Sequence, residues 1–107
     1  MTTPKGVLDF IAGVTWDDLP QEVRQQSKLC LLDLIGVGAG GAGTKLSRII
    51  RDYSALDMSG ALPMMFDGRG ASAAGVALAG GMTIDALDGH DGFNPAKGHA
   101  GCGLLPA

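Results

Sequence analysis

The sequence predicts an all-α fold with no parallel sheet. Apolar residues recur at intervals of three and four through most of residues 5–85, which is the spacing of one helix face. Residues that favour helix starts, Thr44 and Ser72 among them, precede the later segments of this kind. The length of 107 residues suffices for one small domain around a single core.

Two helices are expected in the first part of the chain. The apolar spacing in KGVLDFIAG predicts a short helix that ends near Gly13. A second helix should run from about residue 19 to the glycines at 36–43. Asp18 is expected to cap it, with Gln21 three residues later as in a capping box. The apolar stripe of this helix consists of Leu19, Val23, Cys30, Leu31, Leu34 and Ile35.

Two further helices are expected after the glycine-rich stretch. Thr44 can cap a third helix. Its apolar face would consist of Leu46, Ile49, Ile50, Tyr53 and Leu56. DMSGALPMMFDGRGAS then forms a connector with one short extended piece. Ser72 can cap a fourth helix that runs to about residue 88, and its many Ala and Gly residues would let neighbouring helices approach closely. After Gly89 the pattern changes to a loop.

The glycine-rich stretch leaves a second interpretation open. LIGVGAGGAG contains G-x-G-x-x-G twice within residues 36–43, a spacing found in dinucleotide-binding loops. Residues 29–35 would then form a strand, and Asp67 would be the acid that binds a ribose. The helical interpretation is favoured because the apolar stripe begins at Leu19, well before the supposed strand. Asp33 would also lie inside a strand that should be buried on both faces.

Composition narrows the classes of partner and compartment. The formal net charge is −3 and the basic residues are scattered, which argues against a nucleic-acid partner. No apolar run approaches the length of a membrane span, so no membrane association is predicted. Cys30 and Cys102 lie far apart and form no disulfide framework, which fits a reducing cytoplasm.

Titratable residues gather near the end of the chain, in a run otherwise rich in glycine. They are Asp85, Asp88, His90, Asp91, Lys97 and His99. Asp85 and Asp88 should share one face at the end of the fourth helix, where carboxylates are poorly placed because the helix end already carries partial negative charge. Such locally unfavourable choices are more common at functional sites than elsewhere. A histidine beside carboxylates can act as a general acid or base near neutral pH. The alternative is a solvated loop whose charges only keep it soluble.

A metal site is a third interpretation of the same run, because Asp and His are ordinary metal ligands. Their spacing matches no closed motif such as H-E-x-x-H, C-x-x-C or an EF-hand loop. The sequence therefore predicts no metal site.

The stretch GMTIDALDGHDGFNPAKGHAGCGLLPA resembles the MmgE/PrpD family, which includes 2-methylcitrate dehydratase, cis-aconitate decarboxylase and iminodisuccinate epimerase. The family shows a helix that ends in a pattern like H-x-L-D-x-D-D, then a loop, then H-P-x-x-x-x-x-P-A. ALDGHD and GHAGCGLLPA stand in these places here. KLCLLDLIGVGAGG and ASAAGVALAGG resemble two earlier helices of the family, so the resemblance covers nearly the whole chain.

The resemblance implies a helical N-terminal domain and a site for a small polycarboxylate, with no metal and no organic cofactor. It implies that Asp88 and His99 are the catalytic residues and that Asp91 is the last Asp of the pattern. Asp91, Lys97 and His90 are the candidates for substrate binding. The sequence departs from the family where His90 replaces an Asp, Gly92 a Thr and Ala100 a Pro.

Family members are several times longer, and their later part supplies further catalytic residues and a second, lid-like domain. Residues 1–107 are therefore expected to be a partial N-terminal domain that is inactive alone. The resemblance implies that the whole protein is a cytoplasmic, cofactor-independent lyase or isomerase, similar to 2-methylcitrate dehydratase of propionate metabolism, and a homodimer. The alternative is a catalytically silent truncated paralogue that only packs with other helices.

Overall fold

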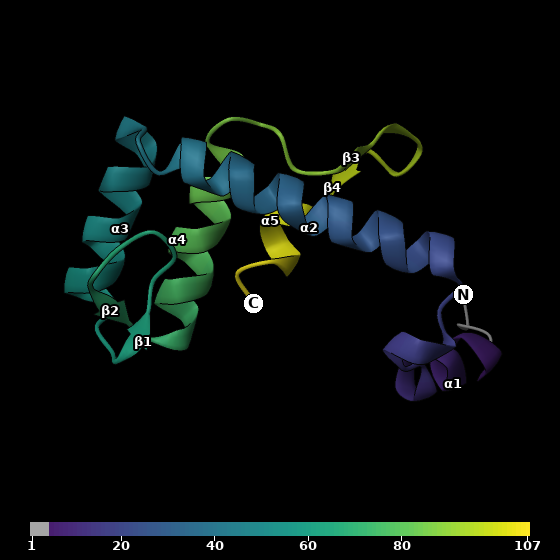
Figure 1. The fold of residues 1–107 in the computed structure, drawn as a ribbon. Coiled ribbons are helices and arrows are strands. Elements are labelled where there is room, and N and C mark those ends of the chain that lie inside the picture. Colours follow the sequence, from purple (N-terminus) through teal and green to yellow (C-terminus); the bar gives the residue numbers. More distant parts are fainter. Residues whose placement is uncertain (1–4) are drawn as a thin grey trace.

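A computed structural model describes residues 5–107 of the chain. Within this range helices are the main elements of the fold (Figure 1), as predicted. The α-helices are α1 (Lys5–Gly13), α2 (Gln21–Gly41), α3 (Lys45–Asp57), α4 (Ala73–Asp85) and α5 (Gly101–Leu104). The one-turn 3-10 helices are η1 (Trp16–Asp18) and η2 (Asn94–Ala96).

Four two-residue strands form two small antiparallel hairpins. They are β1 (Leu62–Pro63), β2 (Gly70–Ala71), β3 (Gly92–Phe93) and β4 (Gly98–His99). β1 pairs with β2, and β3 pairs with β4 with Gly92 opposite His99. No parallel pairing occurs among the described residues, as the sequence predicted. The second hairpin lies in the segment for which only a loop was expected.

The long helix α2 rules out the dinucleotide interpretation. Residues 29–35 and the glycines that follow are continuous helix rather than a strand and a phosphate loop. Asp67 does not stand free to bind a ribose, because its carboxylate accepts hydrogen bonds from Arg69 Nε and Nη2 at 3.0 and 2.8 Å.

The predicted helix starts are correct for α3 and α4 and wrong for α2. Thr44 Oγ1 accepts a hydrogen bond from Ser47 N at 3.1 Å, and Ser72 Oγ accepts one from Gly75 N at 3.2 Å. Asp18 does not cap α2. It ends η1, where its carboxylate accepts hydrogen bonds from the backbone N and the hydroxyl of Thr15 at 2.9 and 2.7 Å.

The fourth helix is shorter than predicted. α4 ends at Asp85, and Asp88 follows in a turn with a left-handed backbone at φ 53°. The N–H of Asp88 donates to the carbonyl of Asp85 at 2.9 Å, which closes this turn. Asp85 and Asp88 are therefore neighbours across a turn rather than along one helix face.

Two glycines of α2, Gly38 and Gly41, serve close packing. A Cβ at Gly41 would overlap the carbonyl oxygen of Thr83 on α4, and one at Gly38 would lie 2.9 Å from the Phe66 ring. Only glycine lets the two backbones approach this closely. The end of α2 is thus fixed against α4, and the end of α4 carries the residues of the candidate site.

The core lies between α3, α4 and the first hairpin. Met64, Ala71 and Ala79 form its apolar cluster. Beside it, the hydroxyls of Ser47 and Thr83 share a fully buried hydrogen bond of 2.7 Å, which joins α3 to α4. Pairing is required there, because a buried hydroxyl without a partner costs about 1–3 kcal/mol.

The rest of the chain extends away from this core. α2 crosses the molecule, with α3, α4 and the first hairpin at one end and α1 beyond the other (Figure 1). The radius of gyration is 16.0 Å, against about 13 Å for a compact chain of this length. No single helix within residues 5–107 is long and apolar enough to cross a membrane. Within these residues, only α2 and α3 taken together have the length and composition of a membrane span, and the two helices are bent by 89° relative to each other.

Candidate active site

The end of α4 and the second hairpin bring four of the clustered side chains together. His90 Nε2 lies 2.8 Å from Asp85 Oδ1 and 3.2 Å from Asp88 Oδ1. The ring centroids of His90 and His99 are 4.6 Å apart, with the rings tilted by 48°. Nitrogen or oxygen atoms of Asp88, His90 and His99 all lie within 4.8 Å of one another. The two residues predicted to be catalytic, Asp88 and His99, therefore share one cluster.

His90 is the buried centre of this cluster. Its side chain is 3 % exposed, whereas those of Asp85 and Asp88 are 55 % and 82 % exposed. Both ring nitrogens are buried, and neither makes a hydrogen bond of acceptable geometry to any described residue. The distances to the two carboxylates are short enough for ion pairs if the imidazole is protonated. The angles do not suit hydrogen bonds from the ring nitrogen to either carboxylate. Buried polar groups without a hydrogen bond are uncommon in folded proteins.

His99 stands on the solvent side of the cluster and borders a cavity. It belongs to β4, where its ring packs over the backbone of Gly92 on β3. The cavity measures about 370 Å³ and is lined by Gly92, Phe93, Asn94, Lys97, Gly98 and His99. Lys97 has a left-handed backbone with φ 48° at the end of η2, which turns the chain back toward β4. His99 and Lys97 thus line the same small cavity.

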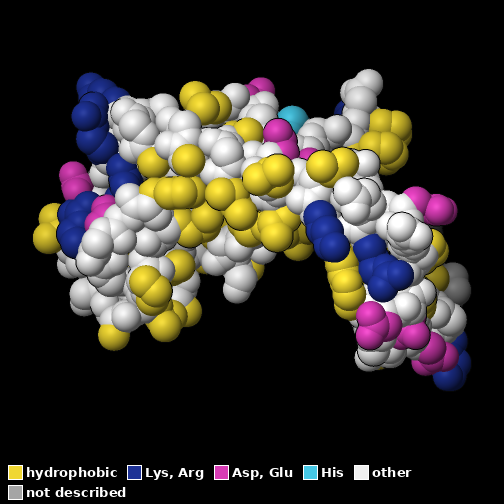
Figure 2. All heavy atoms as spheres, viewed as in Figure 1, with side chains coloured by type: hydrophobic (Ala, Val, Ile, Leu, Met, Phe, Trp, Pro, Cys, Tyr) yellow, Lys and Arg dark blue, Asp and Glu magenta, His cyan; other side chains and the backbone are white. Residues whose placement is uncertain are grey.

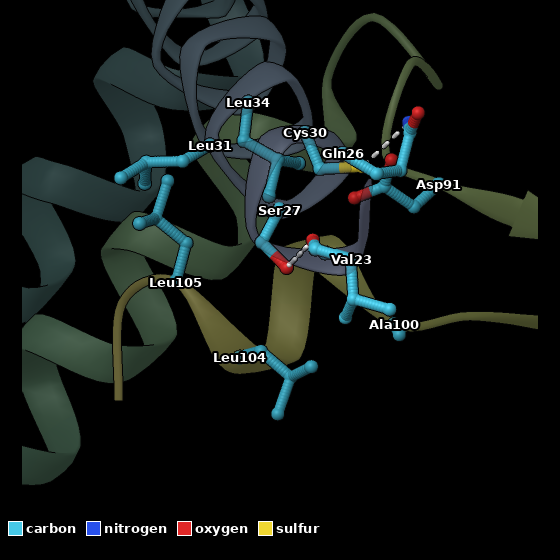
Figure 3. A pocket seen from close by; sticks show the side chains of 11 residues that line it. Val23, Gln26, Ser27, Cys30, Leu31, Leu34, Asp91, Ala100, Leu104 and Leu105 are labelled. Atoms are coloured by element: carbon cyan, nitrogen blue, oxygen red, sulfur yellow. Dashed lines mark hydrogen bonds between the residues drawn. The ribbon is translucent and has the colours of Figure 1, made fainter. Parts of the chain in front are cut away.

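Asp91 lies apart from the other candidates. With Ala100, Leu104 and residues of α2 it lines an apolar groove of about 470 Å³ between α2 and α5 (Figure 3). Close packing holds it there, since a Cβ at Gly101 would lie 2.9 Å from Asp91 Oδ2 and would overlap the side chain of Leu34. The structure therefore places Asp91 in the groove rather than beside His90 and His99.

Two residues of this region were given no role by the sequence reasoning. Asp85 makes the shortest contact to His90. Cys102, in α5, belongs to a second group in which ligand atoms of Asp85, His90 and Cys102 lie within 4.8 Å of one another. The three-residue spacing of Asp85 and Asp88 in the sequence could have indicated a role for Asp85. Nothing in the sequence indicates one for Cys102, because only the packing of α5 against α4 brings Cys102 near His90.

This arrangement can perform acid–base chemistry. An accessible imidazole can take or give a proton near neutral pH, and a neighbouring carboxylate can orient it or bind a hydroxyl group. An ammonium group in the same cavity can form charge-assisted hydrogen bonds to a carboxylate ligand. The groups that could hold a metal ion among residues 5–107 are Asp85 with His90 and Cys102, and Asp88 with His90 and His99.

Comparison with known proteins gives one match. The family model described as the MmgE/PrpD N-terminal domain matches residues 6–107. No curated protein and no solved structure matches the chain.

Proposed function

The chain belongs to the MmgE/PrpD family, and from this membership we propose that it forms one wall of the active site of a lyase or isomerase. The substrate would be a small polycarboxylate, as for 2-methylcitrate dehydratase, and no organic cofactor would be needed. The single observation that carries the proposal is the convergence of Asp88, His90 and His99 beside a cavity that Lys97 also lines.

Each residue has a chemical role in this proposal. Dehydration of a hydroxy acid needs a base to take the proton next to a carboxylate and an acid to help hydroxide leave. His99 is the proposed proton carrier, because its ring borders the cavity. Asp88 would orient that ring or bind the substrate hydroxyl, and Lys97 would bind a substrate carboxylate. His90 would hold Asp88 in place, with its Nε2 atom 3.2 Å from Asp88 Oδ1.

Asp91 fits this proposal less directly. Its side chain lines the groove between α2 and α5, and it does not line the cavity beside His99. A role in substrate binding for Asp91 would require a substrate that reaches past Ala100 into the groove.

The proposal extends to the setting of the enzyme. Cys30 and Cys102 are both free thiols, which supports a reducing cytoplasm. Figure 2 shows apolar side chains running in a band across the visible face over α2, and Leu29, Leu31, Leu32 and Ile35 of this helix are among the exposed ones. An exposed apolar face of this kind supports a homodimer. A place in propionate metabolism would follow from a 2-methylcitrate-like substrate.

The experiment is a turnover assay of the protein expressed from its complete coding gene, with 2-methylcitrate, cis-aconitate and iminodisuccinate. His99→Ala should lower turnover by about 10²–10⁴-fold, because it removes the proton carrier. Asp88→Asn should lower turnover as well. Asp57→Asn, at the exposed end of α3, is the matched control and should leave turnover unchanged.

Circular dichroism confirms that each variant is folded. A folded His99→Ala protein with unchanged turnover would remove His99 from the mechanism. Absence of turnover with all three substrates would favour the alternative, a catalytically silent member of the family that only packs with other helices.

A further inference from the structure

His90 is buried without a satisfied hydrogen bond, and the mechanism proposed above uses it only indirectly. A neutral imidazole needs one hydrogen-bond donor and one acceptor, and a protonated one needs two acceptors. Both ring nitrogens are buried and neither obtains a well-aligned partner among residues 5–107. One ring nitrogen nevertheless lies 2.8 Å from a carboxylate oxygen of Asp85. A metal ion bound at one ring nitrogen would give that nitrogen and the Asp85 carboxylate a common partner.

We propose that Asp85, His90 and Cys102 form a binding site for a divalent transition-metal ion of the zinc class. The site goes beyond the acid–base function, because it uses neither His99 nor Lys97. It also differs from the sequence-based expectation of no metal, since the three ligands are not spaced as a closed motif and converge only through the fold.

The donor atoms suit this kind of ion. Zinc binds carboxylate oxygen, imidazole nitrogen and thiolate sulfur in tetrahedral sites, and three protein ligands leave one position for water. Bond lengths of this kind place neighbouring ligand atoms about 3.3–3.6 Å apart. The three ligand atoms here lie within 4.8 Å of one another, so small side-chain rotations bring them into range.

The backbone holds the three ligands close together. Asp85 is the last residue of α4, and Cys102 lies in the first turn of α5. The two helices pack closely, since a Cβ at Gly81 would lie 3.0 Å from the Cys102 carbonyl oxygen. The N–H of Gly101 also donates to the carbonyl of His90 at 3.3 Å, which fixes the start of α5 beside His90. Sites supported by packed elements keep their ligands better placed than sites on loops.

A rival set, Asp88 with His90 and His99, shares the buried imidazole. It is less enclosed, because Asp88 and His99 are both exposed whereas Cys102 is half-buried. Its ligands also lie on a turn and a hairpin instead of on packed helices. The set that contains Cys102 is therefore the one we assign, and thiolate ligation is the property that distinguishes the two.

The experiment measures Zn²⁺ and Co²⁺ binding to the tag-free 107-residue chain. Isothermal titration calorimetry should give one Zn²⁺ per chain. Co²⁺ should produce the visible bands of a tetrahedral ion together with an ultraviolet thiolate-to-metal charge-transfer band. Cys102→Ser should abolish the thiolate band, and Cys102→Ser and Asp85→Asn should each weaken Zn²⁺ binding by at least about tenfold. Cys30→Ser is the matched control, because Cys30 belongs to neither ligand group, and it should change nothing.

Three results would overturn the proposal. One is a chain that binds no Zn²⁺, in which case His90 is only a buried neighbour of Asp85 and Asp88. Another is Zn²⁺ binding that shows no thiolate band and keeps its affinity in Cys102→Ser. That result would place the ion at Asp88, His90 and His99 instead. The third is equal loss of binding in the Cys30→Ser control. Failure of the metal site and failure of the acid–base function remain distinguishable, because Asp85→Asn and Cys102→Ser leave His99 and Asp88 in place for the turnover assay.

Discussion

Asp67 shows how single residues fix the first hairpin. Its carboxylate accepts hydrogen bonds from the backbone N and the guanidinium of Arg69, and Arg51 Nη1 lies 3.7 Å from Oδ2. The side-chain hydrogen bond from Arg69 is the main cause that lowers the pKa of Asp67 from 3.8 to about 2, against the opposing effect of burial. The folded state therefore favours the ionised carboxylate more strongly than the unfolded chain does.

Asp67→Asn should lower the free energy of unfolding at neutral pH by about 1 kcal/mol, the usual upper size of an ion pair near the surface. Because the folded pKa is below the unfolded one, this stabilisation is present above about pH 4 and is lost as the pH falls toward 2. The measurement is urea unfolding of both proteins across this range. Asp57→Asn, which removes no ion pair found among residues 5–107, is the control. The pKa shift would be contradicted if the difference in unfolding free energy between Asp67→Asn and wild type stayed the same as the pH falls toward 2.

The residues of the candidate site were only partly predictable from sequence. Clustering within one run indicated Asp88, His90 and His99, and a glycine-rich loop is able to fold them together. In the pattern H-x-L-D-x-D-D, Asp85 takes the place of the His and His90 the place of an Asp. The two side-chain types are thus exchanged, and the structure brings them to 2.8 Å. Cys102 could not be predicted, because its distance from His90 depends on how α5 packs on α4.

Glycine packing governs the contact between α2 and α4. Gly41→Ala should destabilise the fold by about 1–3 kcal/mol or more, because its Cβ would overlap a backbone carbonyl oxygen that cannot move out of the way like a flexible side chain. Gly36→Ala is the matched control in the same helix. A Cβ there meets nothing within 4 Å, so the substitution should stabilise the fold by about 0.5–1 kcal/mol through helix propensity.

Urea unfolding of the two variants checks this prediction at the level of the helix pair. Opposite shifts of the unfolding midpoint are expected. Equal shifts would mean that helix propensity alone decides both positions and that the close contact with Thr83 does not exist.

Helix positions were more predictable than helix orientations. Thr44 and Ser72 gave the correct starts, because capping depends on local hydrogen bonds. The buried residues of α3 are Ser47, Ile50 and Ser54, whereas four of the five residues expected on its inward face are exposed. The cause is α4, whose small residues allow so close an approach that small polar side chains fit best between the helices. Apolar spacing does not detect such a contact, because it depends on the size of the partner's side chains.

Across the whole molecule, packing is concentrated at one end. α4 contributes five buried residues and contacts α2, α3 and α5. α1 contributes none, and its apolar side chains Val7, Leu8, Phe10 and Ile11 are all exposed. Local opening costs little free energy where few buried contacts are lost. The two ends of the chain should therefore differ strongly in local stability.

Hydrogen exchange followed by mass spectrometry on the full 107-residue chain should reveal this difference. Amides of α1 should exchange fast, at rates close to those of an unfolded peptide. Amides of α4 should exchange only through global unfolding, because α4 contacts more of the other elements than any other helix does. α3 provides the internal reference, with its buried face of Ser47, Ile50 and Ser54. Protection of α1 equal to that of α4 would contradict the prediction and show that α1 packs against a surface in solution. Exchange at a higher protein concentration would then tell whether a second copy supplies that surface. Only protection by a second copy increases with concentration.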